Sequence, residues 1–271
     1  MNKHDTNRHT FRFFGSRIND SRWVLEDAEA HHALKVLRLP AGEPVEVMDG
    51  KGTVVAGSLA PTGKESAEVN VTWSRTEPAE PVAMELAMGA LKPGDFDDVL
   101  PALVELGMTR ISLFINEQTG KNRVAEKSLD RWQRIVDAAV KQSKRAWRPE
   151  IATFSSMEEW ILDRHGQGRP GGEVRWIFAE PGLEGDGGVG SATPAVAALT
   201  TVTGNAQHPF LSPPPSLIGL VGSEKGFSPP EVRAALDAGF FPVSLGPHVL
   251  RARTATVAAA AMLAMAGHAP Q

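Results

Sequence analysis

Two arginines stand at the start of a predicted helix near the C-terminus, in the stretch VSLGPHVLRARTATVAAAAMLAMAG at residues 243–267. A short apolar run ends at Leu245-Gly246-Pro247, Arg251 and Arg253 follow, and a run rich in alanine and methionine begins. A cation at this end of a helix opposes the helix dipole. Its guanidinium therefore suits an anionic partner, such as a phosphate or a carboxylate. The alternative is an ordinary strand-to-helix turn with solvated arginines.

A second candidate loop, LVGSEKGFSPPE at residues 220–231, follows another predicted strand. It lacks the spacing of a P-loop and of the dinucleotide-binding fingerprint. Ser228, Pro229 and Glu231 have the spacing of a capping box with proline at the first helical position. Local sequence alone therefore predicts a well-capped turn and leaves ligand binding open.

Basic side chains are concentrated in two regions. On and around the predicted amphipathic helix at residues 128–146 they are Lys121, Arg123, Lys127, Arg131, Arg134, Lys141, Lys144, Arg145 and Arg148. A smaller cluster comprises Arg8, Arg12, Arg17, Arg22, Lys35 and Arg38. A run of charges is usually a solvated helix face. In a chain of net charge −4, however, such a local excess is a candidate phosphate-binding strip.

The composition excludes several classes of site. The chain of 271 residues has no cysteine, which removes disulfides, thiolate metal sites and cysteine nucleophiles. Its eight histidines show no metal-ligand spacing, so no metal is expected. The N-terminus lacks the apolar core of a signal peptide, and no uninterrupted apolar run of about 18 residues follows. A cytoplasmic protein without a membrane segment is expected.

The elements that would position these loops fall into two regions. Residues 1–77 read mostly as short strands, with hairpin chemistry at Asp49-Gly50-Lys51-Gly52 and one short helix in HHALKVLRL, which predicts a small β-barrel. From residue 82 to 271 strands alternate with helices, which predicts an α/β domain with a mostly parallel sheet covered on both faces. A segment rich in Gly, Ala, Thr and Pro at 182–215 has no period and is expected to be a flexible insertion.

Taken in order, the motifs resemble those of the ribosomal RNA small subunit methyltransferase E family, whose members methylate a uridine of 16S rRNA at N3. The N-terminal matches are Arg12-Phe13-Phe14, His32 with Val36-Leu37-Arg38, and Asp49-Gly50. The later ones are Glu105-Leu106-Gly107, Gln142 with Arg145 and Pro149-Glu150-Ile151, Gly222-x-Glu224-x-Gly226-Phe227-Ser228, and Leu245-Gly246-Pro247-x-Val249-Leu250-Arg251-x-x-Thr254. The resemblance covers most of the chain.

The resemblance implies a PUA-like RNA-binding barrel at 1–77 and a SPOUT methyltransferase domain with a trefoil knot at 82–271. It also implies a homodimer, S-adenosylmethionine as cofactor, and 16S rRNA or the small ribosomal subunit as partner. The implied cofactor-binding residues are Pro181, Gly222, Gly226, Leu245, Gly246, Val249 and Leu250. Arg251, with Glu224 second to it, is the catalytic candidate. The RNA-binding candidates are Arg12, Arg38, Arg123, Lys141 and Arg145.

Several positions depart from the family pattern. They are Ala102, Lys141, Ser223, Lys225, His248 and Arg253, and at two of them, Lys141 and Arg253, a cation stands where the family has glutamate. Two alternatives therefore stay open. One is a catalytically silent RNA-binding homologue, and the other is a methyltransferase that acts on a different RNA site.

Overall fold

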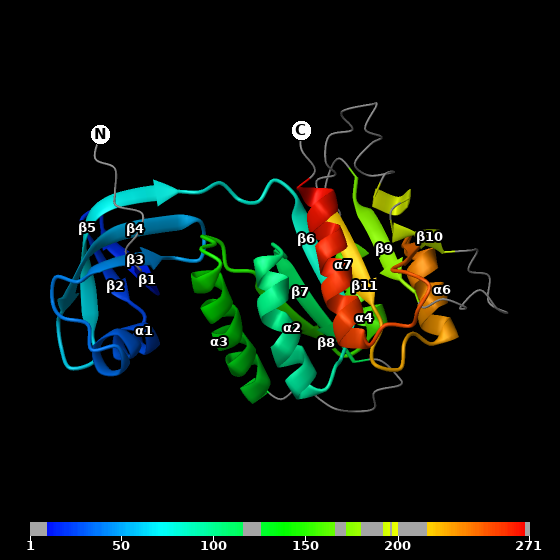
Figure 1. The fold of residues 1–271 in the computed structure, drawn as a ribbon, viewed down its shortest axis with the longest axis horizontal. Helices are drawn as coiled ribbons and strands as arrows, with labels where there is room; N and C mark the ends of the chain where they lie inside the picture. Colours follow the sequence, from blue (N-terminus) through cyan, green and yellow to red (C-terminus); the bar gives the residue numbers. More distant parts are fainter. Residues whose placement is uncertain are drawn as a thin grey trace. The chain divides into compact units, whose positions relative to one another are not determined.

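The computed structural model describes residues 10–115, 126–165, 172–179, 192–195, 197–199 and 216–268 (Figure 1). The chain divides into two compact units, Met1–Ala79 with Val140–Arg148, and Glu80–Ala139 with Pro149–Gln271. The division after Ala79 lies inside the proline-containing segment 77–81. Val140–Arg148, which sequence analysis placed in the second domain, groups with the N-terminal unit instead.

The N-terminal unit is a closed five-stranded barrel, as predicted. Its strands are β1 (Phe11–Asn19), β2 (Arg22–Leu25), β3 (Pro44–Met48), β4 (Thr53–Pro61) and β5 (Ala67–Thr76), in the order β1-β2-β5-β4-β3. Alternate side chains point inward, so that Phe13, Trp23, Val47, Val55 and Val69 belong to one buried cluster. Closure of the barrel leaves no open sheet edge to be covered.

The hairpin between β3 and β4 has the predicted turn chemistry. Asp49 Oδ1 accepts hydrogen bonds from the backbone N–H groups of Lys51 (2.7 Å) and Thr53 (2.9 Å). Gly50 and Gly52 have φ values of 71° and 100°, which disfavour any residue with a Cβ. The turn residues therefore fix the register of β3 against β4.

The short helix of this unit begins earlier than predicted. Helix α1 (Asp27–His31) starts in a stretch with two acids in its first turn, which favour a helix N-terminus, and continues as a π-helical segment, η1 (His32–Val36). Arg38, shortly after it, has φ 53°. Sequence periodicity does not reveal a π-helical segment, because one turn is too short to shift the apolar pattern.

The second unit is built on a seven-stranded sheet. Its strands are β6 (Ala83–Gly89), β7 (Arg110–Phe114), β8 (Glu150–Phe154), β9 (Val174–Phe178), β10 (Thr193–Pro194), β11 (Ser216–Val221) and β12 (Phe241–Ser244), in the order β10-β12-β9-β11-β6-β7-β8. All six pairings are parallel, as predicted. The strand order reverses at β6, and such a reversal opens a crevice at the carboxyl ends of the strands.

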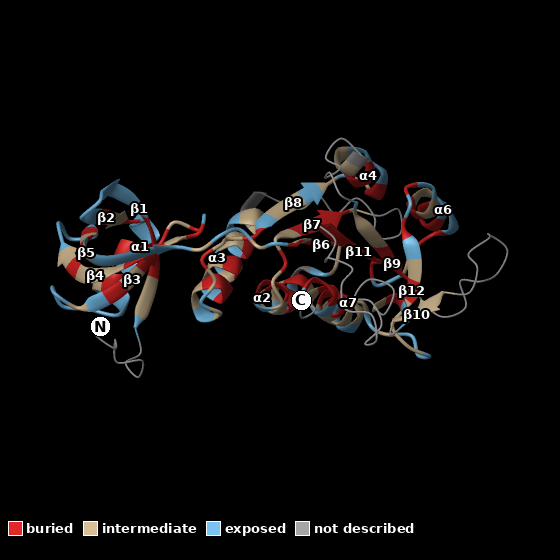
Figure 2. Ribbon diagram, turned by 90° about the horizontal axis from the view of Figure 1, so that it is seen from above, coloured by how far each residue is buried: buried red, intermediate tan, exposed pale blue. Residues whose placement is uncertain are grey.

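Helices cover both faces of this sheet (Figure 2). Helices α2 (Pro93–Glu105) and α7 (Ala252–Gly267) lie on one face, and α4 (Met157–His165) and α6 (Pro229–Asp237) lie on the other. The predicted inward face of α2, namely Phe96, Val99, Leu100, Leu103 and Val104, is fully buried. Gly107, with φ 86°, ends that helix as predicted. Helix α3 (Glu126–Gln142) packs Trp132 edge-on against Phe96, with ring centres 4.5 Å apart.

Three elements escaped sequence analysis. Strand β8 and helix α4 are short, and among the α4 side chains that the structure describes, three are buried: Met157, Trp160 and Ile161. Strand β10 pairs two residues of the 182–215 segment with β12, too few to give a periodic signal. The trefoil knot stays a prediction, because the chain between β9 and β11 includes residues outside the described ranges. Among the described helices, none combines the length and apolar character needed to cross a bilayer.

Candidate functional site

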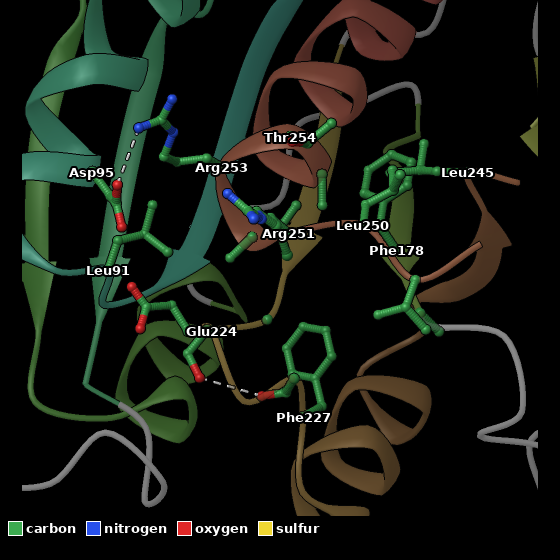
Figure 3. A pocket seen from close by; sticks show the side chains of 18 of the residues that line it. Leu91, Asp95, Phe178, Glu224, Phe227, Leu245, Leu250, Arg251, Arg253 and Thr254 are labelled. Carbon is green, nitrogen blue, oxygen red and sulfur yellow. Dashed lines mark hydrogen bonds and ion pairs between the residues drawn. The ribbon is translucent and has the colours of Figure 1, made fainter.

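A cavity of about 630 Å³ lies at the carboxyl ends of β6, β9, β11 and β12 (Figure 3). Its lining comes from four segments: Leu91, Lys92 and Asp95 after β6; 178–179 at the end of β9; 221–224, Gly226 and Phe227 after β11; and Leu245, Gly246 and 248–255 after β12. This is the crevice expected where the order of parallel strands reverses. Its size is in the range of small-molecule sites, about 300–1,000 Å³.

The turn after β11 forms one wall mainly from backbone. A Cβ at Gly222 would lie 2.9 Å from the carbonyl carbon of Gly226, and Gly226 itself has φ 71°. The N–H of Gly226 donates to the carbonyl oxygen of Ser223 at 2.9 Å and closes the turn. The turn itself therefore requires glycine at both positions, and these two residues add only backbone to the cavity wall.

The predicted capping box is confirmed at the start of α6. The N–H of Ser228 donates to Glu231 Oε2 at 2.7 Å, and the N–H of Glu231 donates to Ser228 Oγ at 3.4 Å. Both side chains are buried, so the end of the glycine turn is fixed by two satisfied hydrogen bonds. The capping and the ligand-binding interpretations of this loop are therefore compatible.

Ser223 and Lys225, two of the departures from the family pattern, fit the turn after β11. Ser223 Oγ accepts a hydrogen bond from the N–H of Lys225 at 3.3 Å, which supports the turn locally. The last residue of β6 lies directly against it, since a Cβ at Gly89 would come within 2.6 Å of the Ser223 nitrogen. The turn thus packs on the central strand with serine and lysine in place.

The loop after β12 forms the opposite wall. Ser244 Oγ accepts from the N–H of Gly246 at 3.3 Å and donates to its carbonyl oxygen at 3.0 Å. Leu245, Leu250 and Phe178 supply apolar side chains on this side of the cavity (Figure 3). The loop therefore combines a glycine held by its neighbour with an apolar surface that suits a flat ring.

Arg251 occupies the N-cap position of α7 and is exposed to the cavity. Its side chain makes no capping hydrogen bond, so the guanidinium is not required to satisfy the helix terminus. The positive end of the helix dipole and the guanidinium both favour negative charge at this point. The structure thus places an anion-attracting group beside the glycine turn.

Two sets of ion pairs cross the rim of the cavity. Lys92 Nζ lies 3.1 Å from Glu224 Oε2, and Arg253 lies 3.2 Å from Asp95 Oδ1 and 2.9 Å from Asp98 Oδ2. The cation at position 253 is therefore matched by two carboxylates of α2. Lys92 and Asp95 were not among the predicted site residues, although their place directly after the first strand of the alternating region was an available signal.

The predicted site residues converge on this cavity. Gly222, Gly226, Leu245, Gly246, Val249 and Leu250 line it, as do Arg251, Glu224 and the unusual His248. Pro181 lies outside the described residues. The lining is a geometric finding, and the roles of these residues stay predictions.

The predicted RNA-binding residues do not form one exposed strip. Arg12, with only 7% of its side chain exposed, pairs with Glu46 at 2.6 Å, and Lys141 pairs with Glu29 at 2.5 Å. These two cations therefore act within the N-terminal unit, and the glutamate-to-lysine departure at 141 is matched by an acid. Arg38 is exposed and Arg145 is half-buried, while Arg123 lies outside the described residues.

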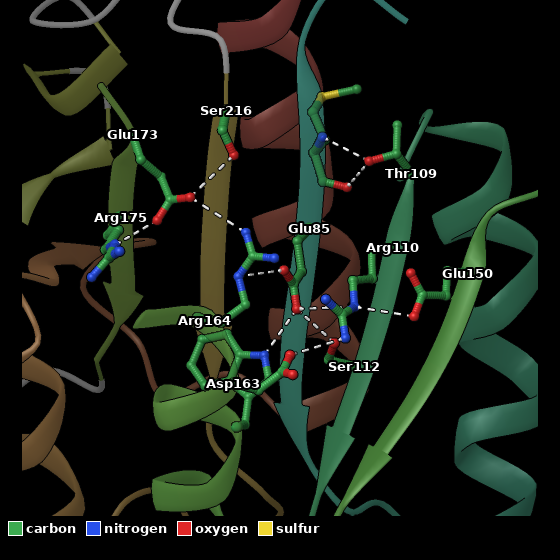
Figure 4. A network of polar contacts seen from close by, with 12 residues as sticks. Glu85, Thr109, Arg110, Ser112, Glu150, Asp163, Arg164, Glu173, Arg175 and Ser216 are labelled. Carbon is green, nitrogen blue, oxygen red and sulfur yellow. Dashed lines mark hydrogen bonds and ion pairs between the residues drawn. The ribbon is translucent and has the colours of Figure 1, made fainter. Parts of the chain in front are cut away.

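A second polar cluster lies at the amino-terminal edge of the sheet (Figure 4). Glu85, with 3% of its surface exposed, accepts hydrogen bonds from Ser112 Oγ at 2.6 Å and Trp160 Nε1 at 2.8 Å. Arg164 Nε lies 3.2 Å from Glu85 Oε2, and the same guanidinium reaches Glu173 at 3.3 Å. The cluster is buried and internally paired, which indicates a structural role.

Within the described residues, no group of three or more His, Cys, Asp or Glu side chains has an arrangement that could hold a metal ion. Besides the paired carboxylates of Asp95 and Glu224, the cavity presents backbone, guanidinium and apolar groups. These groups suit an organic ligand that carries both an aromatic ring and charge.

Comparison with known proteins gives concordant matches. The model of the RNA methyltransferase domain matches residues 78–264, and that of the RNA methyltransferase PUA domain matches residues 25–72. Ribosomal RNA small subunit methyltransferase E of Synechocystis sp. is 28% identical over 253 residues, which cover 91% of this chain and 74% of that protein. The protein of the same name from Mycobacterium bovis is 26% identical over 242 residues, with 87% and 83% covered.

Among solved structures, ribosomal RNA small subunit methyltransferase E from Neisseria gonorrhoeae bound to S-adenosyl methionine is similar, with a TM-score of 0.71 and 27% identity. The alignment covers 93% of this chain and 96% of that one. Both the barrel and the parallel sheet therefore have a counterpart in a single solved protein.

Proposed function

The chain belongs to the RNA methyltransferase family that ribosomal RNA small subunit methyltransferase E represents, and we propose that it methylates a uridine of 16S rRNA at N3 with S-adenosylmethionine. The observation that carries the proposal is the convergence of the two glycine loops and Arg251 on one cavity. An organic cofactor and a base that develops negative charge both find suitable groups there.

The cavity residues fit the cofactor. The turn at Gly222 and Gly226 offers close-packed backbone that a Cβ would disturb, and Leu245, Leu250 and Phe178 offer apolar surface for the adenine ring. We assign these residues, with Gly246, Val249 and Pro181, to cofactor binding.

When bound, S-adenosylmethionine supplies an already activated methyl group, so the protein must align the target and handle the N3 proton. Uridine N3 is largely protonated at neutral pH. Arg251 stabilises the negative charge that develops on the base as its N3 proton passes to solvent water and the methyl group takes its place. Glu224, held by Lys92, orients the base or the cofactor. Because N3 lies on the pairing edge, the target base must leave its stack to reach the cavity.

The barrel contributes RNA contacts in this proposal. The segment Lys35–Arg38 is exposed, with 60% of Val36 and 36% of Leu37 accessible between two cations. A π-helical segment and a residue at positive φ are unusual backbone features that often occur at functional sites. We therefore assign Arg38 and Lys35 to the rRNA backbone, with Arg145 as a further candidate, and leave Arg12 and Lys141 to their internal pairs.

The remaining parts of the proposal are a homodimer and action on the small ribosomal subunit, which would place the protein in the cytoplasm. Val249 (66%) and Met265 (64%) are large apolar side chains exposed beside and on α7. Val249 precedes the first turn of α7 and Met265 lies in its last turn, so these are separate apolar positions, and the homodimer is proposed from the family resemblance.

Mass mapping of 16S rRNA tests the function. Small subunits from a strain without the N3-methyluridine modification are incubated with the protein and S-adenosylmethionine, and the methylated nucleotide is located by mass spectrometry. A uridine carrying an N3-methyl group supports the proposal. Methylation elsewhere would support a different RNA site, and cofactor-independent RNA binding without methylation would support the silent homologue.

Substituting Gly222 with alanine is expected to raise the dissociation constant of S-adenosylmethionine by about tenfold, because the added Cβ would displace the backbone of Gly226. Isothermal titration measures this constant. Gly94→Ala is the matched control, since a Cβ there meets nothing within 4 Å. Equal binding by the Gly222 and Gly94 variants would argue against a cofactor on this turn.

Replacing Lys35 and Arg38 with glutamine is expected to weaken RNA binding and to lower the slope of log affinity against log salt by about 0.7–0.9 for each cation. The affinity for a 16S rRNA fragment would be measured by fluorescence anisotropy at several KCl concentrations. Lys64→Gln, at an exposed position of the same unit, should leave the slope unchanged. A double variant with the wild-type slope would remove this segment from the RNA surface.

A further inference from the structure

We infer that Arg253 is a positioning residue of the cofactor cavity, which fixes the beginning of α2 against the beginning of α7 through Asp95 and Asp98. The inference rests on the proposed function, because the ligand concerned is S-adenosylmethionine. Arg253 would thereby raise the affinity for S-adenosylmethionine by holding the cavity wall in place, without needing to touch the ligand.

The contacts lie on the rim of the cavity (Figure 3). Arg253 Nη1 lies 3.2 Å from Asp95 Oδ1 and 2.9 Å from Asp98 Oδ2. Asp95 lines the cavity together with Leu91 and Lys92, whereas Asp98 does not. Through its ion pairs with Asp95 and Asp98, the Arg253 guanidinium holds the segment after β6 that forms one wall of the cavity.

The charges on this segment alternate in a way that fixes its register. Lys92 is the cation of its pair with Glu224, while Asp95 and Asp98 are the anions of their pair with Arg253. A shift of α2 that exchanged these partners would bring like charges together. Complementary charges of this kind fix relative position more than they add free energy.

The dipoles of α2 and α7 affect the two partners of this ion pair in opposite ways. Arg253 lies in the first turn of α7, where a cation is unfavourable, and that turn contains no acid. Asp95 lies in the first turn of α2, where an acid is favourable. The carboxylates of α2 therefore offset the cost of the cation on α7, and the two helix starts form one electrostatic unit.

Charge reversal tests the inference. Arg253→Glu is expected to raise the dissociation constant of S-adenosylmethionine by about tenfold, since two attractive contacts of a half-exposed side chain become repulsive. Adding Asp98→Arg restores an ion pair of opposite polarity and should return the constant to within about threefold of wild type. Arg233→Glu, exposed on α6 and outside the cavity, is the matched control and should have no effect.

The outcomes separate the inference from the proposed function. An unchanged constant in Arg253→Glu overturns the inference, as does a rise that Asp98→Arg fails to reverse, because Arg253 would then act on the ligand directly. A role in stability alone would lower the melting temperature without changing the constant of the folded protein. If Arg253→Glu does not fold, Arg253→Gln is used in its place. The dissociation constant of S-adenosylmethionine is then expected to rise about threefold, and an unchanged constant would overturn the inference. Absence of binding by the wild-type protein would instead refute the proposed function.

Discussion

The variant Arg251→Ala is expected to lose turnover by about 100- to 1,000-fold while its affinity for S-adenosylmethionine changes by less than about threefold. The reason lies in when the interaction is made. A uridine N3 is neutral when bound and becomes negative only as its proton leaves, so a guanidinium aimed at it acts mainly in the transition state. Because Arg251 makes no capping hydrogen bond, its loss should not weaken α7.

Turnover on small ribosomal subunits and isothermal titration of the cofactor, performed on the same preparation, measure both effects. Arg233→Ala is the matched control, because Arg233 is also exposed but lies outside the cavity. Arg251→Lys should recover part of the rate, since it keeps the charge but loses the planar fork. Turnover of Arg251→Ala near the wild-type value would remove this arginine from the chemistry.

Periodicity predicted those parts of the fold that have enough residues to show a pattern. Helix α2 presents Phe96, Leu100 and Leu103 on one face, and all three are fully buried. The hairpin at Asp49-Gly50 and the capping box at Ser228 and Glu231 are local chemistry, which depends only on neighbours in sequence. Such features are readable because the residues that stabilise them lie within a few positions of one another.

Elements held by distant partners could not be predicted in the same way. Lys141 reads as part of a basic helix face, and only the fold brings it to Glu29, 112 positions away. Strand β10 has only two residues and forms by parallel pairing with β12. Tertiary contacts decide such cases, and a sequence window does not contain them.

The cavity, too, combines features that local sequence predicts with features that depend on distant contacts. Glycines and the strand-to-helix spacing mark both loops after β11 and β12, so that side of the lining was predicted. The contribution of Lys92 and Asp95 depends on β6 lying beside β11, a pairing between residues more than a hundred positions apart. Charge reversal at Arg253 suggested a damaged site when read alone, whereas two aspartates of α2 face it in the fold. The departure is therefore matched by local partners and does not by itself favour the silent homologue.

The second large effect concerns stability and is expected at Glu85, in the centre of the buried polar cluster (Figure 4). Glu85→Gln keeps the shape of the side chain but removes the charge that faces Arg164 at 3.2 Å. Its amide oxygen can keep the hydrogen bonds from Ser112 and Trp160, which both reach Oε1, but its NH2 group then faces the guanidinium of Arg164, donor against donor. Breaking a buried, hydrogen-bonded ion pair from one side costs about 3–5 kcal/mol, because the remaining charge is left in a poorly solvated place.

Urea unfolding of the variant should therefore give a free energy of unfolding about 3 kcal/mol below that of the wild type. Glu158→Gln, at an exposed position of α4, is the matched control and should change it by less than about 0.5 kcal/mol. Cofactor affinity of the folded variant should stay near the wild-type value, because the cluster occupies the amino-terminal edge of the sheet and the cavity the carboxyl edge. A variant within about 1 kcal/mol of wild type would mean that Arg164 finds sufficient compensation in Glu173, 3.3 Å away, and that Glu85 is not the centre of the cluster energetically.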